Sequence, residues 1–330
     1  MNRISVVGAG AWGTALALSG FRAGLAVKLW SSRLDKVETI NQRRENIYRL
    51  PGIALDPQIQ ATTDLKGTAD ADVIILAPPA QYMRSTCEIF HKVWPTHVPL
   101  IIASKGIEDG SAILMSEIVR AYFPDNPLLI LTGPSFASDV AKKLPTAIVL
   151  AAEDIAVAQK LAHLLSSSHF RLYACDDIIG AQIGGACKNI IAIACGIIAG
   201  LDLGDNARAA LVTRGLAEVT RLGCAMGAKL ETFLGLSGVG DMILTCLSSQ
   251  SRNQAFGLAL GRGAPLDELL SNKKTLVEGV HTVSGAVFLA KKLMVDMPIT
   301  FAIYDLLNHG TPLEQLIDQL LSRPLKIERN

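Results

Sequence analysis

The chain has 330 residues, of which half are hydrophobic and only 18% are charged. This composition excludes an intrinsically disordered chain, and the length is enough for two ordinary domains with a sizeable core. The 31 Lys and Arg residues nearly balance the 30 Asp and Glu residues, for a net charge of +1. No overall field favours a nucleic acid or an acidic membrane surface, so a small anionic ligand would need a few well-placed cations.

The mean hydropathy of +0.34 raises the question of a membrane span. The longest apolar run, residues 189–201, is shorter than the roughly 20 residues that cross a bilayer, so it predicts a buried helix. Residues 3–8 lead directly into a glycine motif without the features of a signal peptide. The six cysteines are scattered and form no CxxC pair, which is typical of reduced thiols. We therefore expect a cytoplasmic protein without a membrane span.

Short apolar runs alternate with helical patterns in the first half of the chain. The runs predicted to be strands are residues 4–7, 26–30, 73–77, 100–103, 128–131 and 147–150. Helical patterns between them include residues 14–22, 85–93 and 113–122. This alternation predicts a mostly parallel sheet with helices on both faces, as in an α/β Rossmann-like domain.

From about residue 176 the strand signals nearly vanish. Helical patterns cover residues 207–227, 254–262, 282–293 and 312–321, and Pro265 and Pro298 are expected in the loops between them. We therefore predict a Rossmann-like domain over residues 1–175. An all-α domain would follow over residues 176–330, and a long helix would join the two.

The first predicted strand leads into the loop Gly8-Ala9-Gly10-Ala11-Trp12-Gly13, which opens the first predicted helix. This is the context that a dinucleotide-binding G-x-G-x-x-G motif requires. Gly8 would permit the tight turn, Gly10 would let a pyrophosphate approach the backbone, and Gly13 would let the helix pack closely. The N–H groups at the start of the helix would face the phosphates. The alternative is a glycine-rich turn without a ligand.

The second predicted strand ends at Trp30 and is followed by Ser31, Ser32 and Arg33. A site selective for NAD(H) usually places Asp or Glu here, to hold the ribose 2′-hydroxyl. An arginine with two hydroxyls suits a 2′-phosphate better, so we expect NADP(H) to be preferred and NAD(H) to be possible. Asp35 complicates this interpretation, and Arg33 could instead be an ordinary solvated residue at a helix start.

Two segments follow predicted strands of the sheet, where ligands of open α/β sheets bind. Lys105 comes after the strand at 100–103 and is placed to meet a ligand, unless it is an ordinary surface lysine. Gly133-Pro134-Ser135-Phe136-Ala137 follows the strand at 128–131. Ser135 is expected to cap a helix there, and the segment is expected to line a nicotinamide pocket.

Lys188 interrupts a long run of apolar and small residues. On a helix it shares one face with Ala181, Gly184, Ile191 and Cys195, and the small residues leave room for a ligand beside it. Burial would lower the lysine pKa into a range that is useful for proton transfer. The alternative is a lysine that extends its head group into water.

A glycine-rich turn at 235–240 precedes Asp241, and Thr245 lies four residues further, on the same side of a helix. Ser251, Arg252 and Asn253 then combine a hydroxyl, a guanidinium and an amide, which suits a phosphate monoester. The alternative for Arg252 is a surface cation at a helix end. None of the six histidines has metal-ligand spacing, so no metal is expected.

These motifs together resemble the bacterial type of NAD(P)-dependent glycerol-3-phosphate dehydrogenase. The matching blocks are GAGAWGTA at 8–15, SKGIE at 104–108, GPSFA at 133–137, KNIIAI at 188–193, GLSGVGDMILTC at 235–246, SRN at 251–253 and VEGVHT at 277–282. Each block alone is modest, but all seven in this order are highly specific. Residues 77–80, Ala-Pro-Pro-Ala, depart from the family's more usual A-V-P-[SA].

The resemblance implies an enzyme that interconverts dihydroxyacetone phosphate and sn-glycerol 3-phosphate for glycerophospholipid synthesis. It also implies a cytosolic homodimer, in which residues 1–175 bind NAD(P) and residues 176–330 serve substrate binding, catalysis and dimerisation. The helical domain would be like that of 6-phosphogluconate dehydrogenase. Lys188 would be the proton donor and acceptor, with Asp241 and Thr245 beside it. The implied substrate contacts are Lys105, Lys188, Asn189, Asp241, Ser251, Arg252 and Asn253. With the glycine loop (Gly8, Gly10, Ala11, Gly13) and Ser32, the cofactor contacts would be Trp12, Arg33, Lys105, Gly133, Ser135, Ala137, Arg252, Leu276 and Glu278.

Two other functions stay open on the sequence. A related Rossmann and helical dehydrogenase could act on a β-hydroxy acid or ketopantoate, whose carboxylate needs one cation rather than the cluster at 251–253. A dinucleotide-sensing protein without turnover would need the glycine loop but not a buried Lys188 that faces the pocket.

Overall fold

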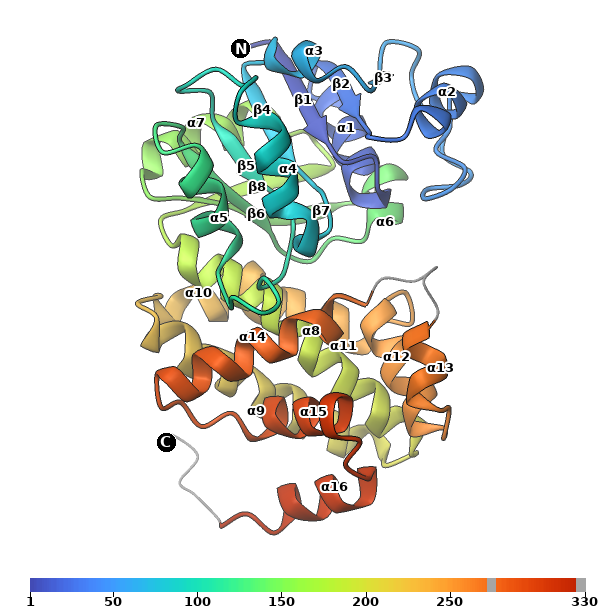
Figure 1. Cartoon of the computed structure of the whole chain (residues 1–330), viewed down its shortest axis with the longest axis vertical. Helices are drawn as coiled ribbons and strands as arrows, with labels where there is room; N and C mark the ends of the chain where they lie inside the picture. Colours follow the sequence, from blue (N-terminus) through green and yellow to red (C-terminus); the bar gives the residue numbers. More distant parts are fainter. Residues whose placement is uncertain (272–276, 325–330) are drawn as a thin grey trace.

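The computed structural model describes residues 1–271 and 277–324, and Figure 1 shows a sheet-containing part above a helical part. The predicted class, a Rossmann-like α/β part followed by an all-α part, is confirmed. Leu276, one of the expected cofactor contacts, lies outside the described residues.

The sheet has eight strands in the order β3-β2-β1-β4-β5-β6-β7-β8, and every pair is parallel except β6 with β7. Its central strands are fully buried because helices cover both faces, which explains why they are nearly continuous apolar runs. The strands are β1 Arg3–Val7, β2 Ala26–Trp30, β3 Gln60–Thr62, β4 Val73–Leu76, β5 Leu100–Ile102, β6 Leu128–Thr132, β7 Thr146–Ala152 and β8 Phe170–Cys175.

Alternate side chains of each strand enter two separate hydrophobic clusters, one on each face of the sheet. Val6 and Leu29 pack with α1 and α7, whereas Val7 and Ile74 pack with α4 and α5. The helices of this part are α1 Ala11–Arg22, α2 Leu34–Arg43, α3 Leu65–Ala69, α4 Met83–Phe90, α5 Met115–Tyr122, α6 Ala137–Ala141 and α7 Ile155–Leu165.

Helix α8, Ile178–Gly200, lies at the centre of the helical part (Figure 1). It begins three residues after β8 ends at Cys175, and every residue from Gly180 to Ile197 is buried. A π-helical turn, η2 (Leu236–Gly240), precedes α11. The other helices are α9 Gly204–Ala225, α10 Leu230–Leu234, α11 Asp241–Leu247, α12 Arg252–Gly261, α13 Leu266–Ser271, α14 Glu278–Lys292, α15 Pro298–His309 and α16 Leu313–Leu321.

Among the described residues, α8 is the one helix that is long and apolar enough to cross a membrane. However, 83% of its most apolar window is buried inside the molecule, as expected for the core helix of the predicted all-α part. The apolar character of this helix is therefore used in packing against its neighbours.

Glycines let α12 cross α8 with the two backbones in contact. A Cβ atom at Gly257 would lie 1.9 Å from the carbonyl oxygen of Ile193, and one at Gly196 would lie 2.1 Å from that of Gln254. No side chain larger than hydrogen fits at either position. This close approach fixes the start of α12, with Ser251 and Arg252, beside the middle of α8.

The structure also differs from the prediction at several elements. Strands β3 and β8 were not predicted, because β3 has only three residues and β8 is an exposed edge strand with little apolar periodicity. Pro298, which was expected in a loop, is instead the first residue of α15. Proline suits this position because its missing N–H would have had no partner within the helix.

Candidate active site

Lys188 lies at the centre of a buried polar cluster between α8 and α11. Its Nζ donates hydrogen bonds to Asp241 Oδ1 at 2.5 Å and to Thr245 Oγ1 at 2.8 Å. Lys188, Asp241 and Thr245 are only 6%, 0% and 5% exposed, so the lysine head group does not extend into water. Asp241 and Thr245 can both reach it because they lie one turn apart on α11.

A second lysine shares the same carboxylate from the sheet-containing part. Lys105 follows β5, and its Nζ donates to Asp241 Oδ2 at 2.7 Å and to the Gly133 carbonyl at 3.1 Å. Each oxygen of Asp241 therefore has its own lysine. This contact joins the carboxyl end of the sheet to α11, so the cluster lies where the two parts of the molecule meet.

Two ammonium groups around one carboxylate leave an excess positive charge in a largely buried place. Burial lowers the pKa of Lys188 to about 8, the Lys105 ammonium adds to this shift, and the Asp241 carboxylate opposes it. Lys188 can therefore gain or lose a proton near neutral pH, and the excess charge suits an anionic substrate.

The start of α12 offers a second positive region near the cluster. Ser251 caps this helix by accepting a hydrogen bond from the Gln254 N–H, and Arg252 is its exposed first residue. A helix N-terminus and a guanidinium both favour an anion such as phosphate. The neighbouring Asn253 is buried, and its Nδ2 donates to Asn189 Oδ1 at 2.9 Å. The structure thus brings together the four residues 189 and 251–253 predicted to contact substrate.

The glycine loop has the shape of a phosphate cradle. Gly8 has a φ of +112°, and a Cβ atom at Gly13 would lie 1.9 Å from the Gly8 carbonyl oxygen, so both positions require glycine. A Cβ atom at Gly10 would meet nothing within 4 Å, which leaves its backbone open to a ligand. No side chain caps α1, which begins at Ala11, so its first N–H groups are available.

Two further polar atoms in this region are buried without a hydrogen-bond partner within the described chain: Trp12 Nε1 and Glu278 Oε2. Burial raises the pKa of Glu278 to about 7, against the opposing effect of the nearby Arg252. Buried polar atoms usually have a partner, so each of these atoms is free to bond a ligand. These residues and the open Gly10 fit a dinucleotide.

At the end of β2, Arg33 is exposed and donates to both carboxylate oxygens of Asp35, at 3.1 and 2.5 Å, while Ser32 is also exposed. Lys36 was not predicted as a site residue. Burial lowers its pKa to about 8, and Arg49 and Arg33 lower it further. Three cations therefore lie close together here. The sequence carried no signal for Arg49, because it comes from a loop rather than from α2.

The prediction that Ser135 caps a helix is wrong. Its Oγ donates instead to the Gly133 carbonyl at 3.0 Å, and α6 begins at Ala137 without any side-chain cap. Phe136, and not Ser135, occupies the N-cap position of α6, and Gly133, which accepts this hydrogen bond, has a φ of +137°. Gly133 and Ser135 are thereby linked to Lys105, whose ammonium uses the same carbonyl.

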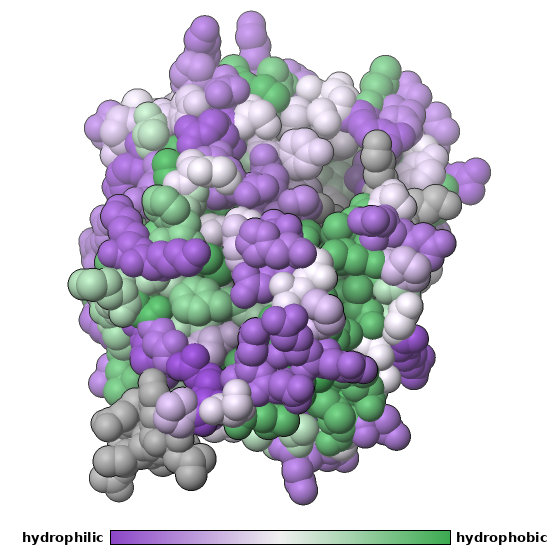
Figure 2. Space-filling view, turned by 60° about the horizontal axis from the view of Figure 1, so that its bottom comes forward, coloured by the Kyte–Doolittle hydropathy of each residue, from purple (hydrophilic) through white to green (hydrophobic). Residues whose placement is uncertain are grey.

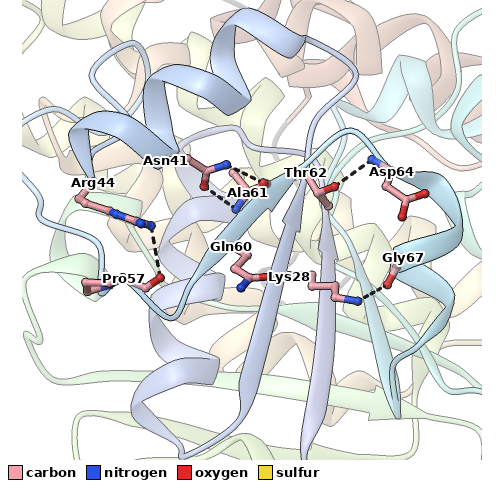
Figure 3. A pocket seen from close by; sticks show the side chains of 9 residues that line it. All are labelled: Lys28, Asn41, Arg44, Pro57, Gln60, Ala61, Thr62, Asp64 and Gly67. Atoms are coloured by element: carbon pink, nitrogen blue, oxygen red, sulfur yellow. Dashed lines mark hydrogen bonds between the residues drawn. The ribbon is translucent and has the colours of Figure 1, made fainter.

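A separate cavity of about 530 Å³ lies at the β3 edge of the sheet, away from this cluster (Figure 3). Its Lys28 ammonium donates to the Gly67 carbonyl, and its Arg44 guanidinium donates to the Pro57 carbonyl. The cavity contains none of the predicted site residues. Within residues 1–271 and 277–324, no group of His, Cys, Asp and Glu side chains could hold a metal ion.

Comparison with known proteins gives consistent matches along the chain. Residues 3–158 match the family NAD-dependent glycerol-3-phosphate dehydrogenase N-terminus, and residues 177–318 match its C-terminus. The glycerol-3-phosphate dehydrogenase (NAD(P)+) of Rhodospirillum rubrum is 48% identical over 329 residues, which cover 99% of this chain and 94% of that protein. That of Parvibaculum lavamentivorans is 46% identical, with 99% and 98% covered. The crystal structure of glycerol-3-phosphate dehydrogenase from Coxiella burnetii superposes with a TM-score of 0.93 at 37% identity, with 98% and 99% covered.

Proposed function

The chain belongs to the NAD-dependent glycerol-3-phosphate dehydrogenases, and from that membership we propose how its residues interconvert dihydroxyacetone phosphate and sn-glycerol 3-phosphate. The observation that carries the proposal is the Asp241 carboxylate shared by the buried Lys188 and by Lys105. A lysine whose pKa lies near neutrality can serve as the acid in one direction and as the base in the other.

Lys188 is proposed to be the proton donor and acceptor. The nicotinamide, when bound, supplies or accepts the hydride. Reduction builds negative charge on the carbonyl oxygen, which the Lys188 ammonium stabilises before it donates a proton from Nζ. In the oxidation of the alcohol the neutral amine accepts that proton. Asp241 and Thr245 hold Nζ in place, so the ammonium does not have to be positioned during the reaction.

Lys105, Ser251, Arg252 and the start of α12 are proposed to hold the substrate. Lys105 brings a second ammonium beside the reacting oxygen and fixes Asp241 from the sheet side. Arg252 and the N-terminus of α12 would grip the phosphate, and this remote binding energy orients the carbonyl toward Lys188. The Ser251 hydroxyl keeps the first turn of α12 intact by capping it.

The glycine loop of α1, Trp12, Gly133, Ala137 and Glu278 are proposed to hold the dinucleotide. For the choice between NADPH and NADH, the proposal is a preference for NADPH. Arg33, Lys36 and Arg49 place three cations together with Asp35 as an opposing charge, and an added 2′-phosphate would relieve their mutual repulsion.

We also propose that the protein is a cytoplasmic homodimer. Each chain would divide into its two domains near residue 175. Hydrophobic side chains gather between hydrophilic ones on the face seen in Figure 2. Exposed apolar residues of the helical part include Phe288, Met294 and Leu321, which a second copy would cover. The end of β8 at Cys175 and the start of α8 at Ile178 support the domain division. Molar mass by light scattering tests the dimer, and a mass of one chain would exclude it.

The first experiment is an absorbance assay at the nicotinamide wavelength, with purified protein and either NADPH or NADH. Loss of signal that depends on dihydroxyacetone phosphate would support the reaction, and the ratio of the two rates would measure the cofactor preference. If folded protein gave no loss with either cofactor, the assignment would fail. Ketopantoate in a parallel assay would then test the related carboxylate activity.

A further inference from the structure

The first turn of α14 lacks a cap of its own. Its N-cap residue is Val277, whose side chain makes no hydrogen bond to the free N–H groups of that turn. One of those groups has a partner on a different helix: the Gly279 N–H donates to Asn253 Oδ1 at 2.9 Å. Asn253, on α12, therefore caps α14 from outside.

The other end of the Asn253 amide is also used. Its Nδ2 donates to Asn189 Oδ1 at 2.9 Å, and Asn189 follows Lys188 on α8. Asn253 and Asn189 are 8% and 5% exposed, so water cannot easily replace either bond. Since the acceptor and the donor of the amide each have a partner, its orientation is fixed.

Three helices meet at this amide. A Cβ atom at Gly279 would lie 2.7 Å from the Asn189 carbonyl oxygen, so the first turn of α14 lies directly against the α8 backbone. Arg252 precedes Asn253 on α12, Lys188 precedes Asn189 on α8, and Glu278 precedes Gly279 on α14. Each helix therefore contributes one member of this contact and one proposed site residue beside it.

We propose that Asn253 is a positioning residue that couples the phosphate end of the site to the cofactor end. It fixes the start of α14, and with it Glu278, relative to Arg252 and Lys188. This inference rests on the proposed function, which places Arg252 on the substrate phosphate and Glu278 on the dinucleotide. A side chain that only contacted the substrate phosphate would have no effect on the cofactor end.

The test measures the affinity of Asn253→Ala for NADPH alone. The fluorescence of the nicotinamide reports binding, and no substrate is present. Removing a helix cap usually lowers the equilibrium constant for forming the helix by about 3- to 30-fold, and NADPH binding, which needs the ordered start of α14, is expected to weaken by up to the same factor. The control is Gln254→Ala, the next residue on α12, which is expected to bind NADPH like the original protein. NADPH affinity that is unchanged in Asn253→Ala would overturn the proposal.

Two further variants separate the cap from general damage. Asn253→Asp keeps an acceptor for the Gly279 N–H, and Asn189 can turn its own amide to donate to it, so NADPH affinity is expected to stay within about 3-fold. Asn189→Ala removes the group that orients Asn253 and is expected to weaken NADPH binding by roughly 2- to 5-fold.

If Asn253→Ala does not fold, Asn189→Ala decides the matter, because alanine suits the interior of α8. Unchanged NADPH affinity in that variant would contradict the proposal. NADPH binding needs no turnover, so failure of the proposed reaction would appear separately, in the assay of the unmodified protein.

Discussion

Lys188 is the residue on which the proposed chemistry depends, and its pKa of about 8 makes that chemistry sensitive to pH. As pH rises through about 8, the ammonium loses its proton, so kcat/KM for reduction of dihydroxyacetone phosphate should fall. It should fall up to tenfold for each further pH unit. Oxidation of sn-glycerol 3-phosphate, which needs the neutral amine, should become faster over the same range. Initial rates in both directions across this range would measure the effect.

Lys188→Ala provides the control for this pH profile. It should lower kcat by ~10²–10⁴, the usual range for loss of a general acid, and remove the pH dependence centred near 8. A variant with near-normal kcat, or one that kept the same profile, would show that the titrating group is another residue.

Arg252 should act through the substrate phosphate. Arg252→Ala is expected to raise KM for dihydroxyacetone phosphate by about 10- to 100-fold, since charge-assisted hydrogen bonds to phosphate are lost. Dihydroxyacetone, which lacks the phosphate, should be used equally poorly by both proteins. The matched control is Arg262→Ala, at the opposite end of α12 and also exposed. If Arg252→Ala left KM for the phosphate substrate unchanged, the phosphate would bind elsewhere.

For single residues, the sequence predicted which side chains form the site better than it predicted the hydrogen bonds between them. Helical spacing related Asp241 to Thr245, and burial made a lone Lys188 costly, but only the resemblance to the family placed the three side chains together. The link from Lys105 to Asp241 spans 136 positions, and no local pattern carries such a contact. The prediction that Ser135 caps a helix failed for a related reason. Its hydroxyl bonds the carbonyl of Gly133, a residue with a positive φ, and helix periodicity does not reveal such a contact.

Among the helices, α15 depends on a carboxylate from α9. Glu218, 1% exposed, accepts hydrogen bonds from the N–H groups of Ile299 and Thr300, at 2.7 and 3.1 Å, and from the Thr300 hydroxyl. Burial raises its pKa to about 7, although these bonds oppose the shift. Sequence reasoning missed this contact because it joins residues about 80 positions apart.

The raised pKa of Glu218 gives a stability prediction with a definite sign. Between the ordinary value of 4.5 and about 7, the folded protein binds more protons than the unfolded chain. The free energy of unfolding should therefore decrease as pH rises through that window, by up to roughly 3 kcal/mol from this group. The glutamine in Glu218→Gln cannot ionise, so this variant should not show the decrease that Glu218 causes. Urea titrations at several pH values would measure the free energy of unfolding of both proteins.

The control for that experiment is Glu314→Gln on α16, since Glu314 is exposed. It should keep the pH dependence of the original protein. Equal slopes of stability against pH in Glu218→Gln and the original protein would show that Glu218 stays ionised when folded.

For the whole molecule, strand–helix alternation and the later loss of strand signals predicted two parts, but not how their cores join. The core of the helical part includes Ile107, Ala112 and Leu114 from the sheet-containing part. In return, Ala181 of α8 packs in the cluster beneath the sheet. These contacts follow from the docking of α8 under the sheet, which no local pattern encodes.

Because each part contributes residues to the core of the other, we expect the two parts to unfold together. Calorimetry should show a single transition, with equal calorimetric and van't Hoff enthalpies, because neither part can lose its core alone. Ile107→Ala should move that transition as a whole, since a fully buried isoleucine lost to alanine costs about 2–5 kcal/mol. Ile155→Ala, at an exposed position on α7, is the control and should change stability little. Two separated transitions, of which Ile107→Ala moved only one, would show that the proposed domains are energetically independent. In that case the Lys105–Asp241 contact would join two separately stable bodies.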